Sequence, residues 1–138
     1  MEECGMKREI LFRGQKAAVE EYVCGSLIID KSGGLHALAQ ITENPVNKGV
    51  IEGWCFGVLP DTVGQFTGLH DKNGTKIFEG DRVRYNHHNG YNMNSFESIV
   101  FYDSKKAAFA IEGFPRNVYF TEFDELQEDL LNHLEVVE

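Results

Sequence analysis

The sequence predicts a mainly β fold, in the sense of a β-rich α+β chain with one short helix near its C-terminal end. Three observations predict it. Turn-forming residues recur at short intervals along the 138 residues, the segments between them are rich in β-branched and aromatic side chains, and helical periodicity appears once, late in the chain. A chain of this length forms one compact domain, or two small lobes that share a core.

The expected strands are short apolar runs, each bounded by Gly, Pro, Asn or Asp. We predict strands over 8–12, 22–29, 35–41, 50–58, 63–66, 82–86, 97–102, 107–112 and 118–120. They belong to a single domain over 1–138, within which an N-terminal β region (6–60) and a second region (62–138) form the two lobes.

A hairpin over 97–112 is the clearest local unit. Its arms read ESIVFY and AAFAIE, and the four polar residues at 103–106 separate them. In the second arm Phe109 and Ile111 alternate with small or polar positions, so one face of the hairpin is expected to be buried.

The segment 77–85 reads IFEGDRVRY and predicts the entry into a small β-barrel. Gly80 supplies a backbone position that other residues resist, and Asp81 can accept hydrogen bonds from nearby amides. Along the following strand Arg82 and Arg84 share one face, which we expect to be exposed. The C-terminal half is therefore predicted to be barrel-like, with an SH3-like arrangement as one option.

One helix is expected near the C-terminal end. Apolar residues recur there at helical spacing, with acidic residues between them, and Thr121 precedes Asp124 as in a capping box. The apolar positions are Phe123, Leu126, Leu130 and Leu131. A short final strand follows at 134–137.

The net charge of −9 is unevenly distributed. Residues 121–138 contain seven acids and no Lys or Arg, so the other 120 residues hold 15 acids (22 − 7) against 13 bases. An acidic chain argues against a broad phosphate-binding surface, because such a surface needs clustered cations. A local basic patch on the nearly neutral body stays compatible with the charge.

The cysteines Cys4, Cys24 and Cys55 are widely spaced, and their pattern matches neither a zinc ribbon nor a redox pair. Cys24 and Cys55 have apolar neighbours, so we expect them to be small buried core residues. The N-terminal segment has no apolar core of a signal peptide, and the apolar runs are strand-sized. We therefore expect a protein of the cytoplasm, with reduced thiols and no membrane span.

The motif content does not indicate an enzyme. We predict no catalytic, cofactor-binding or metal-binding residue, because no spacing selects a nucleophile with its base or a complete ligand set. His87-His88 lies in a stretch that we expect to be a loop, and no third ligand stands at a familiar spacing. Asp71-Lys72-Asn73-Gly74 resembles the opening of a calcium loop, but its glycine comes two positions early, so we predict a tight turn.

The run from 62 to 83, TVGQFTGLHDKNGTKIFEGDRV, resembles the signature of the YopX family of phage and prophage proteins. That family shows Gln-aromatic-Thr-Gly-Leu-x-Asp-x-x-Gly followed by Ile-aromatic-Glu-Gly-Asp. The segments REILFR (8–13) and GSL (25–27) are similar to its N-terminal part. The resemblance implies a β-rich fold with a barrel-like C-terminal half and an origin in a phage or prophage genome. It implies no activity, cofactor or catalytic residue.

Two main functional hypotheses follow. The first is a non-enzymatic phage or prophage accessory protein of the bacterial host cytoplasm, which acts through protein–protein contacts as a homo-oligomer or on an unknown phage or host protein. The second is a small-barrel nucleic-acid-binding protein. Its contact residues would be Arg82, Arg84, Lys105, Lys106 and Tyr102, with Arg116 and Tyr119 as further candidates. A hydrolase with a metal at His87-His88 is a third and weaker hypothesis.

Overall fold

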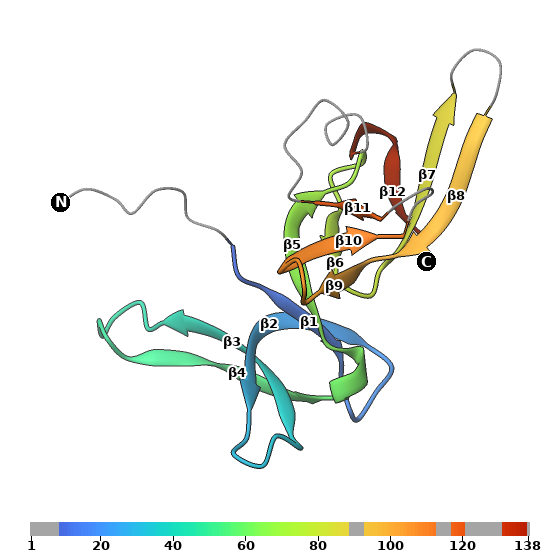
Figure 1. The fold of residues 1–138 in the computed structure, drawn as a ribbon. Coiled ribbons are helices and arrows are strands. Elements are labelled where there is room, and N and C mark those ends of the chain that lie inside the picture. Colours follow the sequence, from blue (N-terminus) through green and yellow to red (C-terminus); the bar gives the residue numbers. More distant parts are fainter. Residues whose placement is uncertain (1–8, 89–92, 113–116, 121–130, 138) are drawn as a thin grey trace. The chain divides into compact units, whose positions relative to one another are not determined.

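The computed structural model describes residues 9–88, 93–112, 117–120 and 131–137, and most of them lie in β-strands (Figure 1). The predicted mainly β class is confirmed. The chain divides into two compact units between Gln65 and Phe66, a few residues after the division that the sequence suggested at 60–62. Among the helical residues of the described ranges, no helix is long and apolar enough to cross a membrane.

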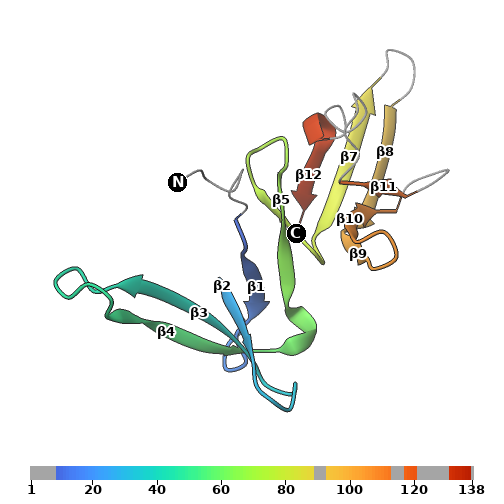
Figure 2. The same ribbon diagram turned by 60° about the vertical axis from the view of Figure 1, so that its left-hand side comes forward.

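The N-terminal unit is built from antiparallel strands in the order β4-β3-β2-β1-β5 (Figures 1 and 2). Its elements are β1 (Phe12–Gln15), β2 (Tyr22–Ile29), β3 (His36–Glu43), β4 (Ile51–Val58), the 3-10 helix η1 (Pro60–Thr62) and the start of β5 (Gly64–His70). Each of β2, β3 and β4 has eight residues, so the unit consists mainly of long hairpins.

The core of this unit is small. Among its described residues, the buried cluster consists of Val23, Leu38 and Val58. Partly buried neighbours from β1, β2, β4 and the segment before β5 pack against them: Phe12, Leu27, Phe56 and Val63. Leu38 lies opposite Leu27 and Phe56 in the ladders, so one face of β3 supplies the centre of the core.

The C-terminal unit contains the rest of β5 and seven further strands. They are β6 (Lys76–Phe78), β7 (Arg82–His88), β8 (Met93–Ile99), β9 (Phe101–Asp103), β10 (Ala108–Ile111), β11 (Val118–Tyr119) and β12 (Leu134–Val137). Two three-stranded sheets, β12-β7-β8 and β11-β10-β9, accompany the β5–β6 pair. They enclose a core of Ile77, Val83, Val100, Ile111, Phe120 and Leu134.

The ladders between the described strands of this unit do not close into a barrel, so the predicted barrel-like arrangement is not confirmed. The strand that was expected over 97–102 is divided at Val100. The Val100 amide donates to the Asp81 carbonyl at 2.9 Å, and the Val100 carbonyl accepts from the Gly80 amide at 2.8 Å. These bonds divide the expected strand into β8, which pairs with β7, and β9, which pairs with β10.

The Glu79–Asp81 turn itself has the features that the sequence predicted. Gly80 has a φ of 91°, a conformation that favours glycine, and the Asp81 carboxylate accepts a hydrogen bond from the Phe78 amide at 2.8 Å. On β7, Val83 is buried and Arg82 is exposed, as the alternation predicted.

Two predicted loops were misplaced. The turn between β9 and β10 covers 104–107, because Asp103 already pairs with Ala108, and Ala107 adopts a φ of 51°. The stretch that contains His87 and His88 was expected to be a loop, but both residues belong to β7, which pairs with β8 up to the match of His88 with Met93. The two histidines therefore lie in a regular ladder, and the loop prediction was wrong for them.

Most of the predicted C-terminal helix, 121–130, lies outside the described residues. Residues 131–133 are helical, and Leu131 packs against the core of the C-terminal unit. The final strand is confirmed, because β12 covers Leu134–Val137 and Leu134 is completely buried.

Candidate interaction surface

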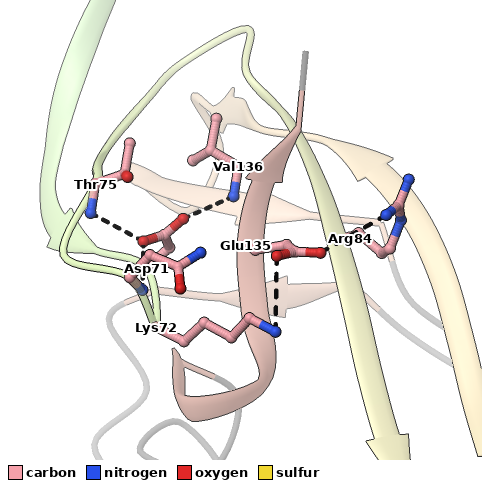
Figure 3. A network of polar contacts seen from close by, with 7 residues as sticks. Asp71, Lys72, Thr75, Arg84, Glu135 and Val136 are labelled. Atoms are coloured by element: carbon pink, nitrogen blue, oxygen red, sulfur yellow. Dashed lines mark hydrogen bonds and ion pairs between the residues drawn. The ribbon is translucent and has the colours of Figure 1, made fainter.

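Asp71 begins the tight turn between β5 and β6. Its carboxylate is buried, and one oxygen accepts hydrogen bonds from the amides of Asn73 at 2.8 Å and Thr75 at 2.9 Å. The other oxygen accepts from the Val136 amide of β12, also at 2.8 Å (Figure 3). The predicted turn is confirmed, and the same carboxylate joins it to a strand 65 residues later in the chain.

The environment of Asp71 lowers its pKa. Burial acts to raise the pKa, but the backbone bonds from Val136, Thr75 and Asn73 and the charge of Lys72 favour the ionised form and together outweigh burial. The pKa of Asp71 therefore lies below its ordinary value of 3.8.

This shift predicts how acid affects stability. Because the folded-state pKa is lower than the unfolded one, ionised Asp71 stabilises the fold above pH 3.8, and that contribution is lost as the pH falls through the folded-state value. Urea unfolding at a series of pH values should show the difference in stability between the wild type and Asp71→Asn shrinking below pH of about 4. A difference that stays constant down to pH of about 2 would contradict this role.

A row of ion pairs lies beside this turn (Figure 3). Lys72 Nζ is 3.6 Å from Glu135 Oε2, Arg84 is 3.7 Å from Glu135 Oε1, and Arg84 is also 3.3 Å from Glu97. All four side chains are partly exposed, so the pairs add little stability. Their main consequence is electrostatic, since two carboxylates balance the charge of Arg84.

The structure does not gather the five predicted contact residues into one patch. Arg82 and Arg84 lie on β7, whereas Tyr102 lies on β9 in a different sheet. Lys105 and Lys106 lie exposed in the turn after β9. The Tyr102 ring meets Phe109 edge-on at 5.2 Å.

The turn that carries the two lysines is fixed by Asp103. Its carboxylate accepts hydrogen bonds from the Tyr119 hydroxyl and from the Lys105 amide, both at 2.9 Å. The pKa of Asp103 is lowered, mainly by the hydrogen bond from Tyr119. Burial acts to raise this pKa, but the amides of Lys105 and Lys106 and the charge of Lys106 add to the lowering. Tyr119 is therefore a structural partner of this turn.

Sequence reasoning missed a second surface, in the N-terminal unit. Beyond the part of β3 that pairs with β2, β3 and β4 continue as a two-stranded extension, which we call the arm and define as residues 40–54 (Figures 1 and 2). Its large apolar side chains face solvent: Trp54 is 74% exposed, Ile51 65% and Ile41 64%. The sequence carried no signal of this exposure, because apolar residues on both faces of β4 are typical of a strand that other elements cover.

The two cysteines of β2 and β4 also differ from expectation. Cys55 was expected in the core but is exposed on β4, and Cys24 on β2 is only partly buried. The reason is that a short apolar run predicts a strand without showing whether another element covers it. Cys4 lies outside the described residues. Within the described ranges, no three His, Cys, Asp or Glu residues are grouped so that they could hold a metal ion.

Comparison with protein families assigns the chain to a family. The model of the family described as YopX protein matches residues 11–137, nearly the whole chain. The chain therefore belongs to the YopX family, as its central motif indicated.

Comparison with solved structures supports the fold. The crystal structure of protein EF1440 from Enterococcus faecalis is similar with a TM-score of 0.57 and 22% sequence identity, over 95% of this chain and 92% of that chain. At this identity the likeness concerns the fold alone. A comparison with curated proteins gives no match.

Proposed function

We propose that this YopX-family protein is a phage- or prophage-derived accessory protein that acts in the host cytoplasm through protein–protein contacts, as a homo-oligomer, and without enzymatic activity. The observation that carries the proposal is the exposed apolar surface of the arm. Contiguous exposed apolar residues on a soluble unit mark contact sites, and single scattered ones do not. In the arm, Ile41 and Ile51 lie on one face of two paired strands, and Trp54 lies on the other face.

The roles of the polar residues support a non-enzymatic function. The two buried acids, Asp71 and Asp81, each accept hydrogen bonds from backbone amides of their own turns. Glu135 is held between Lys72 and Arg84. These side chains maintain the fold of the C-terminal unit. The hydrogen bonds of Asp71 and Asp81 give these two acids of the family motif a structural role, so a catalytic role is not needed to explain them.

Nucleic-acid binding has weaker support. Arg84 is already paired with Glu97 and Glu135, and the remaining candidates are divided between two sheets. Duplex binding needs several cations on one surface. The nucleic-acid alternative therefore rests on the exposed charges of Arg82, Lys105 and Lys106.

The deciding experiment is sedimentation equilibrium of the purified full chain over a wide concentration range. We expect a reversible homo-oligomer whose population rises with concentration by mass action. A monomer at every concentration would contradict homo-oligomer formation. Fluorescence anisotropy with labelled DNA and RNA at low salt tests the alternative, and binding that is lost in the Arg82→Glu/Lys105→Glu/Lys106→Glu variant would favour nucleic acid instead.

A further inference from the structure

The direction of the backbone groups along β4 can be worked out from two hydrogen bonds. The Val50 carbonyl accepts from the Asn44 amide at 2.7 Å, so Val50 faces β3. The Gly57 carbonyl accepts from the Ala17 amide at 2.9 Å, so Gly57 faces the opposite side. Because successive residues of an antiparallel strand alternate in direction, Ile51, Gly53 and Cys55 present their amide and carbonyl groups on the outer edge of β4.

This outer edge is occupied at one end only. Among the described residues, Lys16 and Ala17 lie against Val58 and Gly57, while the edge from Ile51 to Cys55 has no strand beside it. We call these five residues the open edge. The pairing of β4 with β3 is continuous over all eight residues, so no bulge turns the edge away.

The open edge also lacks the residues that normally protect such an edge from pairing. It contains no Lys and no Pro, and its single charge is Glu52. The Glu52 carboxylate already accepts a hydrogen bond from the Asn44 side chain within the arm. An isolated two-stranded ribbon is marginally stable in water, so a further strand beside β4 would stabilise the arm.

We propose that the open edge of β4 pairs antiparallel with the open edge of a second copy of this chain, about a two-fold axis at Gly53. The inference rests on the homo-oligomer of the proposed function and names its interface. This register pairs Ile51 with Cys55 of the second copy, and Gly53 with its own counterpart. All three outward-facing residues then exchange backbone hydrogen bonds.

The side chains favour a second copy as the occupant. Glu52 would lie opposite Trp54 of the second copy, so no acid faces an acid. Ile41 lies opposite Gly53 in the arm, so the two Gly53 residues leave space between the two Ile41 side chains. Small and large residues in one row pack well across a sheet.

The arm carries little net charge. It contains Glu43, Lys48 and Glu52, a balance of −1 (one base minus two acids). Glu43 also accepts a hydrogen bond from the Gly49 amide. Pairing of two arms therefore brings together one net negative charge from each copy, and both acids of each arm already accept hydrogen bonds within it.

Proline tests the edge. Ile51→Pro removes one outward amide and leaves the bonds to β3 intact, because Ile51 directs its amide away from β3. We expect this variant to be monomeric in sedimentation equilibrium, with the wild-type circular dichroism spectrum. The matched control Ile51→Thr keeps the amide and should stay dimeric. A second control, Ser26→Lys, places a charge on the exposed face two strands away, in the row of Ala39 and Cys55, and should also stay dimeric.

Disulfide trapping tests the register. In a background with Cys4→Ser and Cys24→Ser, the Ile51→Cys variant should form a covalent dimer with native Cys55 under mild oxidation. Directly paired residues have Cα atoms about 5.5 Å apart or closer, within disulfide range. Val50→Cys in the same background, and Ile51→Cys with Cys55→Ser, should form no such dimer.

The outcomes separate the two proposals. A monomeric wild type contradicts both the homo-oligomer and this interface. A wild-type oligomer that survives Ile51→Pro and gives no trapped dimer overturns the interface and leaves the homo-oligomer standing. A wild-type oligomer that Ser26→Lys dissociates while Ile51→Pro does not would show face-to-face packing of the sheets and would also overturn the interface.

Discussion

Replacing Asp71 by alanine should lower the free energy of unfolding by about 3–5 kcal/mol, because three amide donors lose an ionised acceptor in a buried site. The donors are Asn73, Thr75 and Val136. Urea denaturation measures the loss. Hydrogen exchange should locate it, with the amide of Val136 becoming much less protected because β12 loses its bond to the turn.

Asp30 provides the matched control. It occupies a similar turn between β2 and β3, where its carboxylate accepts from the Leu35 amide at 3.0 Å and from the Ser32 hydroxyl at 2.8 Å. This turn is exposed, and these two bonds of Asp30 stay within the hairpin. Asp30→Ala should therefore cost much less than Asp71→Ala. Equal losses would show that the bond to β12 has no special importance.

Replacing Leu38 by alanine should destabilise the N-terminal unit by about 2–5 kcal/mol through lost apolar burial and the cavity that remains. Leu38 is completely buried, and its cluster contains only two other buried residues, Val23 and Val58. So small a core has few neighbours that can close around a cavity. Urea denaturation followed by circular dichroism measures the loss, and hydrogen exchange at the amides of β2 and β3 should assign it to this unit.

The control is Ile28→Ala on the neighbouring strand. Ile28 is 51% exposed, so its truncation removes little buried surface and should change stability only slightly. A loss at Ile28 as large as that at Leu38 would mean that the exposed face of the sheet is buried in solution, for instance against another copy.

The parts of the fold that depend on local chemistry could be predicted from the sequence. The bounds of β2, the turn at Asp71 and the exposure of Arg82 opposite buried Val83 follow from propensity and alternation alone. The break between β8 and β9 could not be predicted, because its cause is the pairing of Val100 with Gly80 and Asp81, 20 residues earlier in the sequence.

The candidate interaction surface was harder to predict from the sequence. Ile41, Ile51 and Trp54 have the composition of core residues, and the sequence does not reveal that no further element covers them. Likewise, Arg84 is recognisably on an outer face, but its neutralisation by Glu135 depends on the register of a strand about 50 residues later. Local patterns identify strands, whereas exposure and charge balance depend on which strands become neighbours.

The place of β12 has a consequence for how the protein is made. Residues 134–137 pair with β7, and their amides and carbonyls also meet the turn at 71–72. While the ribosome is still adding them, that sheet lacks one of its three strands and Leu134 is missing from the core. The N-terminal hairpins need only contacts among residues already synthesised. Nascent chains should therefore acquire protease resistance in the first unit earlier, and in the second only after residues 134–137 have left the exit tunnel.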